Sequence, residues 1–147
     1  MAKILNIETS TTVCSIAVGI NGEITSLNEI NNGYSHAEEI EGLIDKSVSE
    51  AGISLNDLDA ISVSKGPGSY TGLRIGVSIA KGLCFGLKVP LISVPTLEAM
   101  ARHPRLVSLP HSYKIPMLDA RRMEVYSTVL KNSNEVVQPT TAVIVDA

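Results

Sequence analysis

The pattern of apolar and polar residues in the first part of the chain predicts three neighbouring β-strands. Residues 3–8 and 13–20 are largely apolar runs rich in Ile and Val, which favour extended strands. Residues 23–30 alternate between apolar and polar side chains, as a half-buried strand does. Asn21-Gly22 stands between the second and third runs, and both residues tolerate the positive φ angles of a tight hairpin turn. We therefore expect an antiparallel meander.

A helix and a fourth strand follow this meander. Ser35 and Glu38 form a capping-box pattern, in which each side chain can bond to the backbone amide of the other residue. The helix that they start has one apolar face, made of Ile40, Leu43, Ile44 and Val48. Ala51-Gly52 is expected to end the helix, and residues 59–64 are expected to form the fourth strand.

The next helix, predicted at residues 71–87, is unusually apolar. Arg74, Ser78 and Lys81 lie four and three residues apart and form one narrow polar stripe. Nearly all of its other residues are apolar or glycine, so we expect the helix to be buried on more than one side. The sheet can cover one side, and a neighbouring helix or another chain has to cover the rest.

The remainder of the chain predicts one more strand, one more helix and the start of a second lobe. Residues 89–94 have a strand pattern, and Pro95 suits the first turn of a helix that ends near His103. Farther on, an apolar run ends at Asp119, a polar turn follows and a β-rich run returns. The same pattern surrounds Glu8, which indicates a weak internal repeat.

These patterns divide the chain into a first lobe at residues 1–105, a linker at 106–113 and the start of a second lobe at 114–147. A lobe that stops there could not bury its sheet. We therefore expect either that the chain is a fragment or that residues 114–147 pack onto the first lobe.

The element order β-β-β-α-β-α-β-α predicts an α/β fold with a mixed five-stranded sheet and helices on both faces. In such sheets, ligands bind at the carboxyl ends of the strands. The turn ETSTT (residues 8–12) and the turn GPGSYTG (residues 66–72) both fall at that end, which makes them candidate binding segments.

Composition narrows the function classes. The 147 residues are 44% hydrophobic and carry a net charge of −3, and the 12 Lys and Arg are scattered, so nucleic acid is expected only as a shared ligand. Cys14 and Cys84 do not suggest a disulfide framework, and the N-terminus has no signal-peptide pattern. No apolar stretch reaches the roughly 20 residues of a membrane helix. We expect a cytoplasmic, soluble protein without a metal motif.

Both candidate turns have two interpretations. In the first, Glu8 and the hydroxyls after it could hold a metal–phosphate complex, or they could form a solvated turn whose hydroxyls bond their own backbone. In the second, Gly66, Gly68 and Gly72 could leave amides free for an anion at a helix N-terminus, or they could allow close packing. The second turn lacks the Gly-Lys-Ser/Thr ending of a Walker loop.

Five segments together resemble the bacterial TsaB (YeaZ) family. They are ILNIETSTTVCSIAV, SHAEEIEGLID, SKGPGSYTGLRIGVSIAKGL, VPLISVPTLEAMA and LDARRMEVYS, and the resemblance runs from residue 3 to about residue 130. The glycine-rich segment is the most specific of the five. The resemblance implies the actin-like ATPase fold of Hsp70 chaperones and sugar kinases, which has two RNase-H-like lobes. Because known members continue well past residue 147, it also implies that the second lobe is truncated here.

The resemblance implies a non-catalytic scaffold role in making threonylcarbamoyladenosine beside the anticodon of tRNA. The expected partners are a TsaD-like paralogue, which is the catalytic subunit activated by direct contact, and a TsaE-like ATPase. A homodimer is expected when the paralogue is absent, and tRNA only through the complex. No cofactor is implied, although weak nucleotide binding stays open at a vestigial site made of Glu8, Thr9, Ser10, Thr11, Gly66 and Gly68.

The resemblance also allows a check for the metal site of the paralogue. TsaD-like proteins carry a His-x-x-x-His motif after the fifth strand, and the matching positions in this chain hold Thr96 and Met100. Threonine is a poor metal ligand, and methionine is too soft to replace an imidazole at an iron or zinc site. The resemblance therefore implies that no metal is bound here.

In this family, the first two helices of the first lobe form the partner interface. We predict that the outward face of these helices buries against another chain, and that small residues four apart permit close helix approach. The predicted interface consists of Ile40, Leu43, Gly72, Arg74, Gly76, Val77, Ala80, Lys81 and Phe85. Two alternatives stay open: an ATP-dependent kinase or carbamoyltransferase of the same fold that uses Glu8 and the glycine loop, and a homodimer without another partner.

Overall fold

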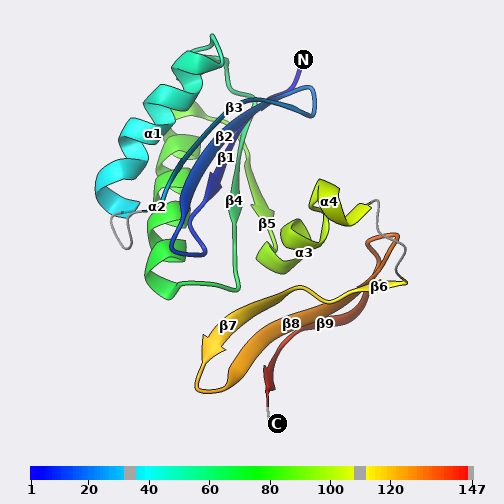
Figure 1. The fold of residues 1–147 in the computed structure, drawn as a ribbon. Helices are drawn as coiled ribbons and strands as arrows, with labels where there is room; N and C mark the ends of the chain where they lie inside the picture. The colour runs from blue at the N-terminus through cyan, green and yellow to red at the C-terminus, as the bar shows by residue number, and fades with distance from the viewer. Residues whose placement is uncertain (32–35, 108–111, 146–147) are drawn as a thin grey trace. The chain divides into compact units, whose positions relative to one another are not determined.

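The structure is a computed structural model that describes residues 1–31, 36–107 and 112–145 (Figure 1). The chain divides into two compact units, which are described separately below. The first unit comprises Met1–Lys65 and Ser69–Val94, and the second comprises Gly66–Gly68 and Pro95–Ala147.

The first unit is built on a mixed five-stranded sheet. Its strands are β1 (Lys3–Glu8), β2 (Cys14–Ile20), β3 (Glu23–Ile30), β4 (Ala60–Ser64) and β5 (Leu91–Val94), in the order β3-β2-β1-β4-β5. The pairs β1–β2 and β2–β3 are antiparallel, whereas β4 runs parallel to both β1 and β5. The predicted meander and the predicted mixed sheet are both confirmed.

Local sequence explains the turn between β2 and β3. Asn21 and Gly22 have φ angles of 55° and 86°, and these two residues tolerate positive φ better than most others. The loop therefore contains only two residues, and it sets β3 antiparallel to β2. The hairpin predicted from Asn-Gly is confirmed.

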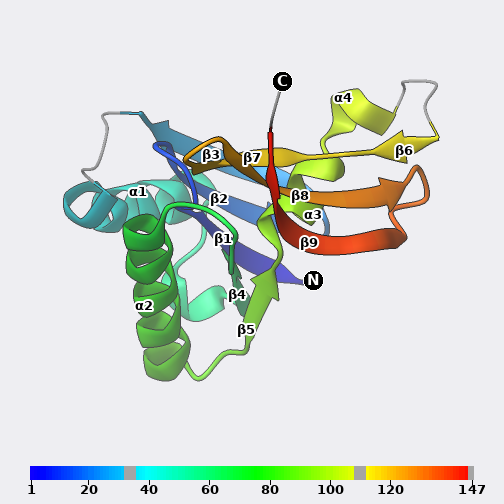
Figure 2. The ribbon, with the colours of Figure 1, turned by 90° about the horizontal axis from the view of Figure 1, so that it is seen from below.

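Two helices cover one side of this sheet. Helix α1 (His36–Glu50) contacts β2 and β3, helix α2 (Tyr70–Leu87) contacts β4, β1 and β5, and the two helices contact each other (Figures 1 and 2). A short 3-10 helix, η1 (Leu55–Asp57), precedes β4. The core between the helices and the sheet is closed by fully or almost fully buried side chains, among them Leu5, Ile7, Ile16, Ile40, Ile61 and Ala80. The predicted capping box lies partly outside the described residues, because Ser35 is not among them.

Strand β3 buries two polar side chains, those of Ser26 and Asn28, and exposes the apolar side chains of Ile24 and Leu27. Ser26 pairs with Val18 and Asn28 pairs with Ile16, so both polar residues share the core-facing side of the sheet. Leu27 lies on the opposite face and is 51% exposed. The predicted half-buried strand is confirmed, but hydrogen bonds rather than apolar packing hold its inner side.

The second unit contains two short helices and a four-stranded sheet. The elements are α3 (Thr96–Ala101), α4 (Pro104–Val107), β6 (Tyr113–Lys114), β7 (Met117–Arg121), β8 (Glu124–Lys131) and β9 (Val136–Ile144). Strand β8 is central and pairs antiparallel with β6, β7 and β9. All nine residues of β9 are exposed.

The two compact units are not divided at the predicted linker, residues 106–113. The structure divides the chain between Val94 and Pro95 and groups α3 and α4 with the second sheet. The physical reason is that α3 contacts β8, and that its residues Leu97 and Ala101 are fully buried. Within the described part of the first unit, α1 and α2 cover one face of the sheet, and α3 belongs to the other unit.

The β7–β8 hairpin repeats a detail of the β1–β2 turn. The amide of Ser10 donates to Glu8 Oε1 at 2.6 Å, and the amide of Arg121 donates to Asp119 Oδ1 at 2.7 Å. Because both contacts join an acidic side chain to the amide two residues later, the predicted internal repeat extends to hydrogen bonding.

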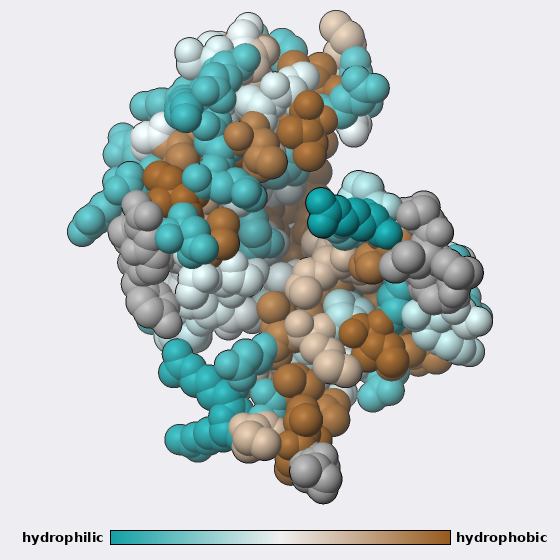
Figure 3. All heavy atoms as spheres, viewed as in Figure 1, coloured by the Kyte–Doolittle hydropathy of each residue, from teal (hydrophilic) through white to brown (hydrophobic). Residues whose placement is uncertain are grey.

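In Figure 3, hydrophilic side chains gather at the tip of the β7–β8 hairpin.

Among the described residues, no helix has the length and apolar character needed to cross a membrane.

Candidate functional site

The turn after β1 is organised by Glu8. Its Oε1 accepts a hydrogen bond from the amide of Ser10 at 2.6 Å, and its Oε2 accepts a bond from the hydroxyl of Ser64 at the end of β4. Both carboxylate oxygens are therefore engaged within the chain. This supports a role for Glu8 in joining the turn to the parallel strand beside it.

Two hydroxyls in the same turn are buried without a partner. Thr9 is fully buried and Ser10 is 3% exposed, and neither Thr9 Oγ1 nor Ser10 Oγ has a hydrogen-bond partner among the described residues. Buried polar groups are usually satisfied. If a ligand reached this turn, these two hydroxyls could bond to it without giving up a bond within the chain, whereas each carboxylate oxygen of Glu8 already accepts one hydrogen bond.

The first turn of α2 bonds to its own surroundings. The amide of Ser69 donates to the carbonyl of Ser10 at 2.6 Å, and the hydroxyl of Ser69 caps the helix by accepting from the amide of Gly72 at 3.3 Å. Thus Gly72 does not leave a free amide for an anion. The geometry supports the packing interpretation of the glycine-rich segment more than the phosphate interpretation.

The residues of the predicted nucleotide site are divided between the two units. Glu8, Thr9, Ser10 and Thr11 lie together in the first unit, and Gly66 and Gly68 fall in the second. The two glycines have φ angles of 108° and 157°, which L-residues rarely adopt, so their conformation explains why glycine stands there. Nucleotide binding at these residues stays a prediction.

Five residues of the predicted partner interface are buried within the first unit, and their part in a partner contact stays a prediction. They are buried against the rest of the first unit and are Ile40, Leu43, Gly72, Gly76 and Ala80. A Cβ atom on Gly76 would overlap Thr9 Oγ1, so this glycine permits the approach of α2 to its own sheet. The stripe of small residues four apart is real, but within this chain it is the inner side of α2.

The other predicted interface residues do lie on the outer side of α2 or at its margin. Arg74, Lys81 and Phe85 are exposed, and Val77 is half-buried. Phe85 is 89% exposed, which is unusual for a large aromatic side chain. The guanidinium of Arg74 stacks over the ring of Tyr70 at 5.3 Å from the ring centre.

Sequence reasoning missed two glycines on this outer side. Gly82 and Gly86 are exposed, and a Cβ atom added at either would meet no heavy atom within 4 Å. Glycine within a helix costs about 1 kcal/mol relative to alanine, and the packing of this unit does not explain that cost. Their four-residue spacing around Phe85 was visible in the sequence, but so was the identical spacing of the inner stripe.

A groove of about 360 Å³ separates part of α1 from α2. Its lining is mostly apolar and comes from α1, η1 and α2: Ala37, Ile40, Glu41, Ile44, Asp45, Leu55, Ile79 and Leu83. Acidic side chains occur only on the α1 side. The groove and the exposed side of α2 together form an apolar surface of the first unit that another molecule could contact.

The residues at the position of the paralogue's metal site do not fit a metal. Thr96 is buried at the start of α3, and Met100 lies one turn farther along and is 38% exposed. A hydroxyl and a thioether are not the imidazole donors that iron or zinc would take there. Across the described ranges, no three His, Cys, Asp or Glu residues cluster in a way that could hold a metal ion.

A family model and the curated relatives place this chain in the same family. The family described as tRNA N6-adenosine threonylcarbamoyltransferase (TsaD) matches residues 27–147. The chain is 38% identical over 123 residues to the tRNA threonylcarbamoyladenosine biosynthesis protein TsaB of Haemophilus influenzae, a match that covers 84% of this chain and 51% of that protein. The chain therefore spans about half the length of this curated relative.

Two solved structures share the fold. The YeaZ protein from Pseudomonas aeruginosa superposes with a TM-score of 0.81 at 27% identity, covering 99% of this chain and 68% of that one. The activator of 2-hydroxyisocaproyl-CoA dehydratase from Clostridium difficile, with bound ADPNP, superposes with a TM-score of 0.55 at 17% identity. The match covers 97% of this chain and 45% of that one. The second likeness concerns the fold alone. The predicted actin-like ATPase fold is confirmed.

Proposed function

Because the chain belongs to the TsaB (YeaZ) group of the tRNA N6-adenosine threonylcarbamoyltransferase family, we propose that it is a non-catalytic subunit for threonylcarbamoyladenosine synthesis. Its partner would be a catalytic TsaD-type paralogue, which it activates by direct contact. The observation that carries this proposal is the uncovered side of α2, where Phe85 stands 89% exposed beside Gly82 and Gly86.

The uncovered side of α2 has the chemistry of an interface. A large aromatic side chain beside two open glycines lets a partner helix approach the backbone closely while the ring fills a pocket on that partner. The same approach would explain why glycine stands at two exposed helix positions despite its cost. We expect the contact to bury roughly 800 Å² on each partner, as standard interfaces do.

The charges on the two helices favour a partner that carries both basic and acidic side chains. Helix α1 carries Glu38, Glu39, Glu41, Asp45 and Glu50 against the single cation Lys46, whereas the only charged residues of α2 are Arg74 and Lys81. A second copy of the chain would present the same two surfaces, so α1 of one copy could face α2 of the other. This complementarity supports a homodimer when the paralogue is absent.

The non-catalytic role is supported by the residues that could otherwise take part in catalysis. Both oxygens of Glu8 are hydrogen-bonded within the chain, and the position of the paralogue's metal ligands holds Thr96 and Met100. A TsaE-like ATPase would then supply nucleotide chemistry to the assembly. With a net charge of −3, the chain would reach tRNA through the complex rather than alone.

The test combines binding with activity. The purified 147-residue chain is mixed with a TsaD-type protein, and binding is measured by titration calorimetry. Formation of threonylcarbamoyladenosine is measured with the TsaD-type protein, TsaE, tRNA and an activated threonylcarbamoyl donor, with and without the chain. We expect binding, product formation that depends on the chain, and no product when the chain replaces the paralogue.

Two substitutions separate the surface from the fold. Gly82→Leu has open space in the free subunit and introduces a better helix former than glycine, so it should not lower the unfolding temperature but should weaken binding at least tenfold. Lys131→Ala removes an exposed, ion-paired cation on β8 and serves as the control, with unchanged binding expected. Wild-type affinity in Gly82→Leu would refute the interface. Turnover of ATP or of a carbamoyl substrate by the isolated chain would instead favour the kinase or carbamoyltransferase alternative.

A further inference from the structure

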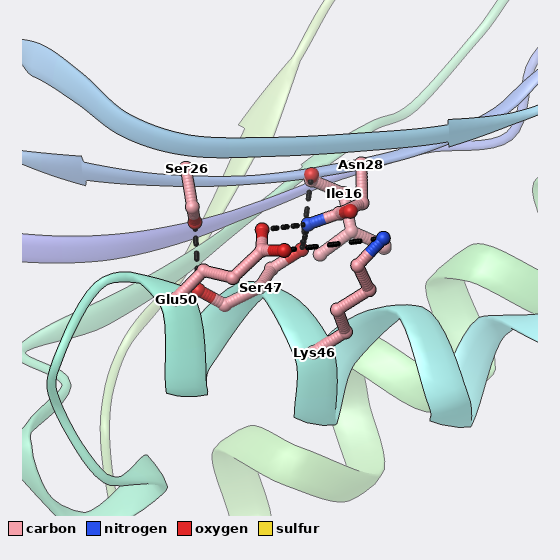
Figure 4. A network of polar contacts seen from close by, with 6 residues as sticks. All are labelled: Ile16, Ser26, Asn28, Lys46, Ser47 and Glu50. Carbon is pink, nitrogen blue, oxygen red and sulfur yellow. Dashed lines mark hydrogen bonds and ion pairs between the residues drawn. The ribbon is translucent and has the colours of Figure 1, made fainter.

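A buried polar network fixes α1 to the sheet (Figure 4). Ser47 of α1 is fully buried; its hydroxyl donates to the carbonyl of Ile16 at 3.3 Å and accepts from Asn28 Nδ2 at 3.1 Å. The carbonyl of Ser47 accepts from the hydroxyl of Ser26 at 2.7 Å. Asn28 Nδ2 also donates to Glu50 Oε2 at 2.7 Å. Three elements are thus joined at one residue of α1.

The network replaces apolar packing where α1 crosses β3. Ser26 and Asn28 are the inward residues of this strand, whereas its Leu27 faces the other side and is half exposed. Burial of apolar surface is non-directional, whereas a shift of α1 would leave the buried polar groups of Asn28 and Ser47 unbonded. The hydrogen bonds therefore specify one position of the helix along the strands.

The position of α1 in turn sets the width of the groove. A neighbouring side of the same helix provides Ile40, Glu41 and Asp45 to the groove lining, and Ile79 and Leu83 of α2 provide the facing wall. Because α2 is packed against β4 and β1, the separation of the two walls depends on where α1 sits. None of the network residues lines the groove itself.

We propose that Asn28 and Ser47 are positioning residues for partner binding, because they hold α1 at the spacing from α2 that the partner requires. This inference rests on the proposed function for its partner, but the position of α1 can also be measured without one. Ser26 and Glu50 complete the arrangement, since they bond to the carbonyl of Ser47 and to the amide of Asn28.

The principal variant is Asn28→Leu, which keeps the side-chain size and removes both amide hydrogen bonds. In the free chain, spin labels at Glu41 and Ser78 report the distance between α1 and α2; we expect the distance to shift by about 1–2 Å. With the TsaD-type protein, we expect at least a tenfold loss of affinity at a temperature where the variant is fully folded. Ser47→Ala should change both quantities in the same direction.

A rescue and a control make the result specific. Asn28→Asp with Glu50→Gln exchanges donor and acceptor between these two side chains but leaves Ser47 Oγ without its donor, so it should restore the label distance and the affinity only in part. Val63→Ala weakens the core of β4 without touching the network, so it should lower stability and leave both quantities unchanged.

Each result then has one meaning. A folded Asn28→Leu chain with an unchanged label distance, or with wild-type affinity, overturns the inference, as does an equal loss of affinity in Val63→Ala. A wild-type chain that does not bind the paralogue overturns the proposed function instead, and the label distance still decides whether the network positions α1.

Discussion

Thr9 lies against Gly76 so closely that no other residue fits at position 76 without movement. A Cβ atom there would overlap Thr9 Oγ1 and would lie 3.4 Å from both Cβ and Cγ2 of Thr9. Thr9 is fully buried and β-branched, so its side chain has little freedom to turn away. The relationship ties the turn after β1 to the middle of α2 and gives the glycine-rich segment a packing role.

Gly76→Ala should therefore destabilise the chain although alanine favours helices. Overpacking costs about 1–3 kcal/mol, and the gain in helix propensity offsets about 1 kcal/mol of it. We expect a net loss of up to about 2 kcal/mol in the free energy of unfolding, measured by urea titration. Gly82→Ala, at an open position, should instead raise stability by about 1 kcal/mol.

The cause of the loss can be isolated with Thr9→Ala, which removes the clashing oxygen. The double variant with Gly76→Ala should recover part of the lost stability, because the two sites are in contact and their effects are not additive. Additive effects would show that the contact with Thr9 is not the cause.

Substitutions in the β7–β8 loop should stabilise the second unit. Arg121, Arg122 and Met123 have φ angles of 67°, 53° and 62°, a run of positive values in residues that rarely adopt them. Asn21-Gly22 form the two-residue loop between β2 and β3 with suitable residues. Replacing Arg122-Met123 by Asn-Gly should raise the free energy of unfolding of the second unit by about 1–2 kcal/mol. Slower amide exchange in β7 and β8 would confirm it, and unchanged exchange would contradict it.

The stability of the chain should depend on pH through Cys14. Burial raises the pKa of the Cys14 thiol above its ordinary value of 9.0, and the charges of Glu39 and Glu8 add to the effect. The folded state thus holds the thiol proton more tightly than the unfolded state. This contribution to stability is complete below pH 9 and is lost as the pH rises through the raised pKa.

Cys14→Ala isolates that contribution from other groups that titrate at high pH. Above pH 9, the free energy of unfolding of the wild type should fall more steeply than that of the variant, by at most about 1.4 kcal/mol per pH unit. Parallel pH profiles would contradict the prediction. Cys84, whose pKa is also raised by burial, is retained in both proteins, so its contribution cancels.

We expect Glu8 to contribute to the stability of the fold and not to ATP hydrolysis. Glu8→Ala removes the acceptors of the Ser10 amide and of the Ser64 hydroxyl, so we expect a loss of about 2–3 kcal/mol. Glu8→Gln keeps the size and can bond to both groups, so we expect only about 1 kcal/mol. Stability is measured by urea titration beside an assay of ATP hydrolysis. ATP turnover by the wild type that Glu8→Gln abolishes would identify a catalytic carboxylate.

Several features of this protein follow from nearby residues and were predicted for that reason. The Asn21-Gly22 turn, the order of the elements in the first unit and the polar stripe of Arg74, Ser78 and Lys81 depend on turn chemistry and on periodicity within one element. The repeated acid-to-amide contact at Glu8 and Asp119 also follows from a local pattern. Such signals state which residues share a face of a helix or strand.

Only the tertiary structure decided which neighbours pack against each face of a helix or strand. Helix α2 has two stripes of small residues with four-residue spacing, and only the position of Thr9 shows that Gly76 lies inside while Gly82 lies outside. In the same way, Asn28 and Ser26 are inward because Ser47 satisfies them, and α3 joins the second unit because it contacts β8. Periodicity leaves these choices open, since the partners that settle them are distant along the chain and meet only when it folds.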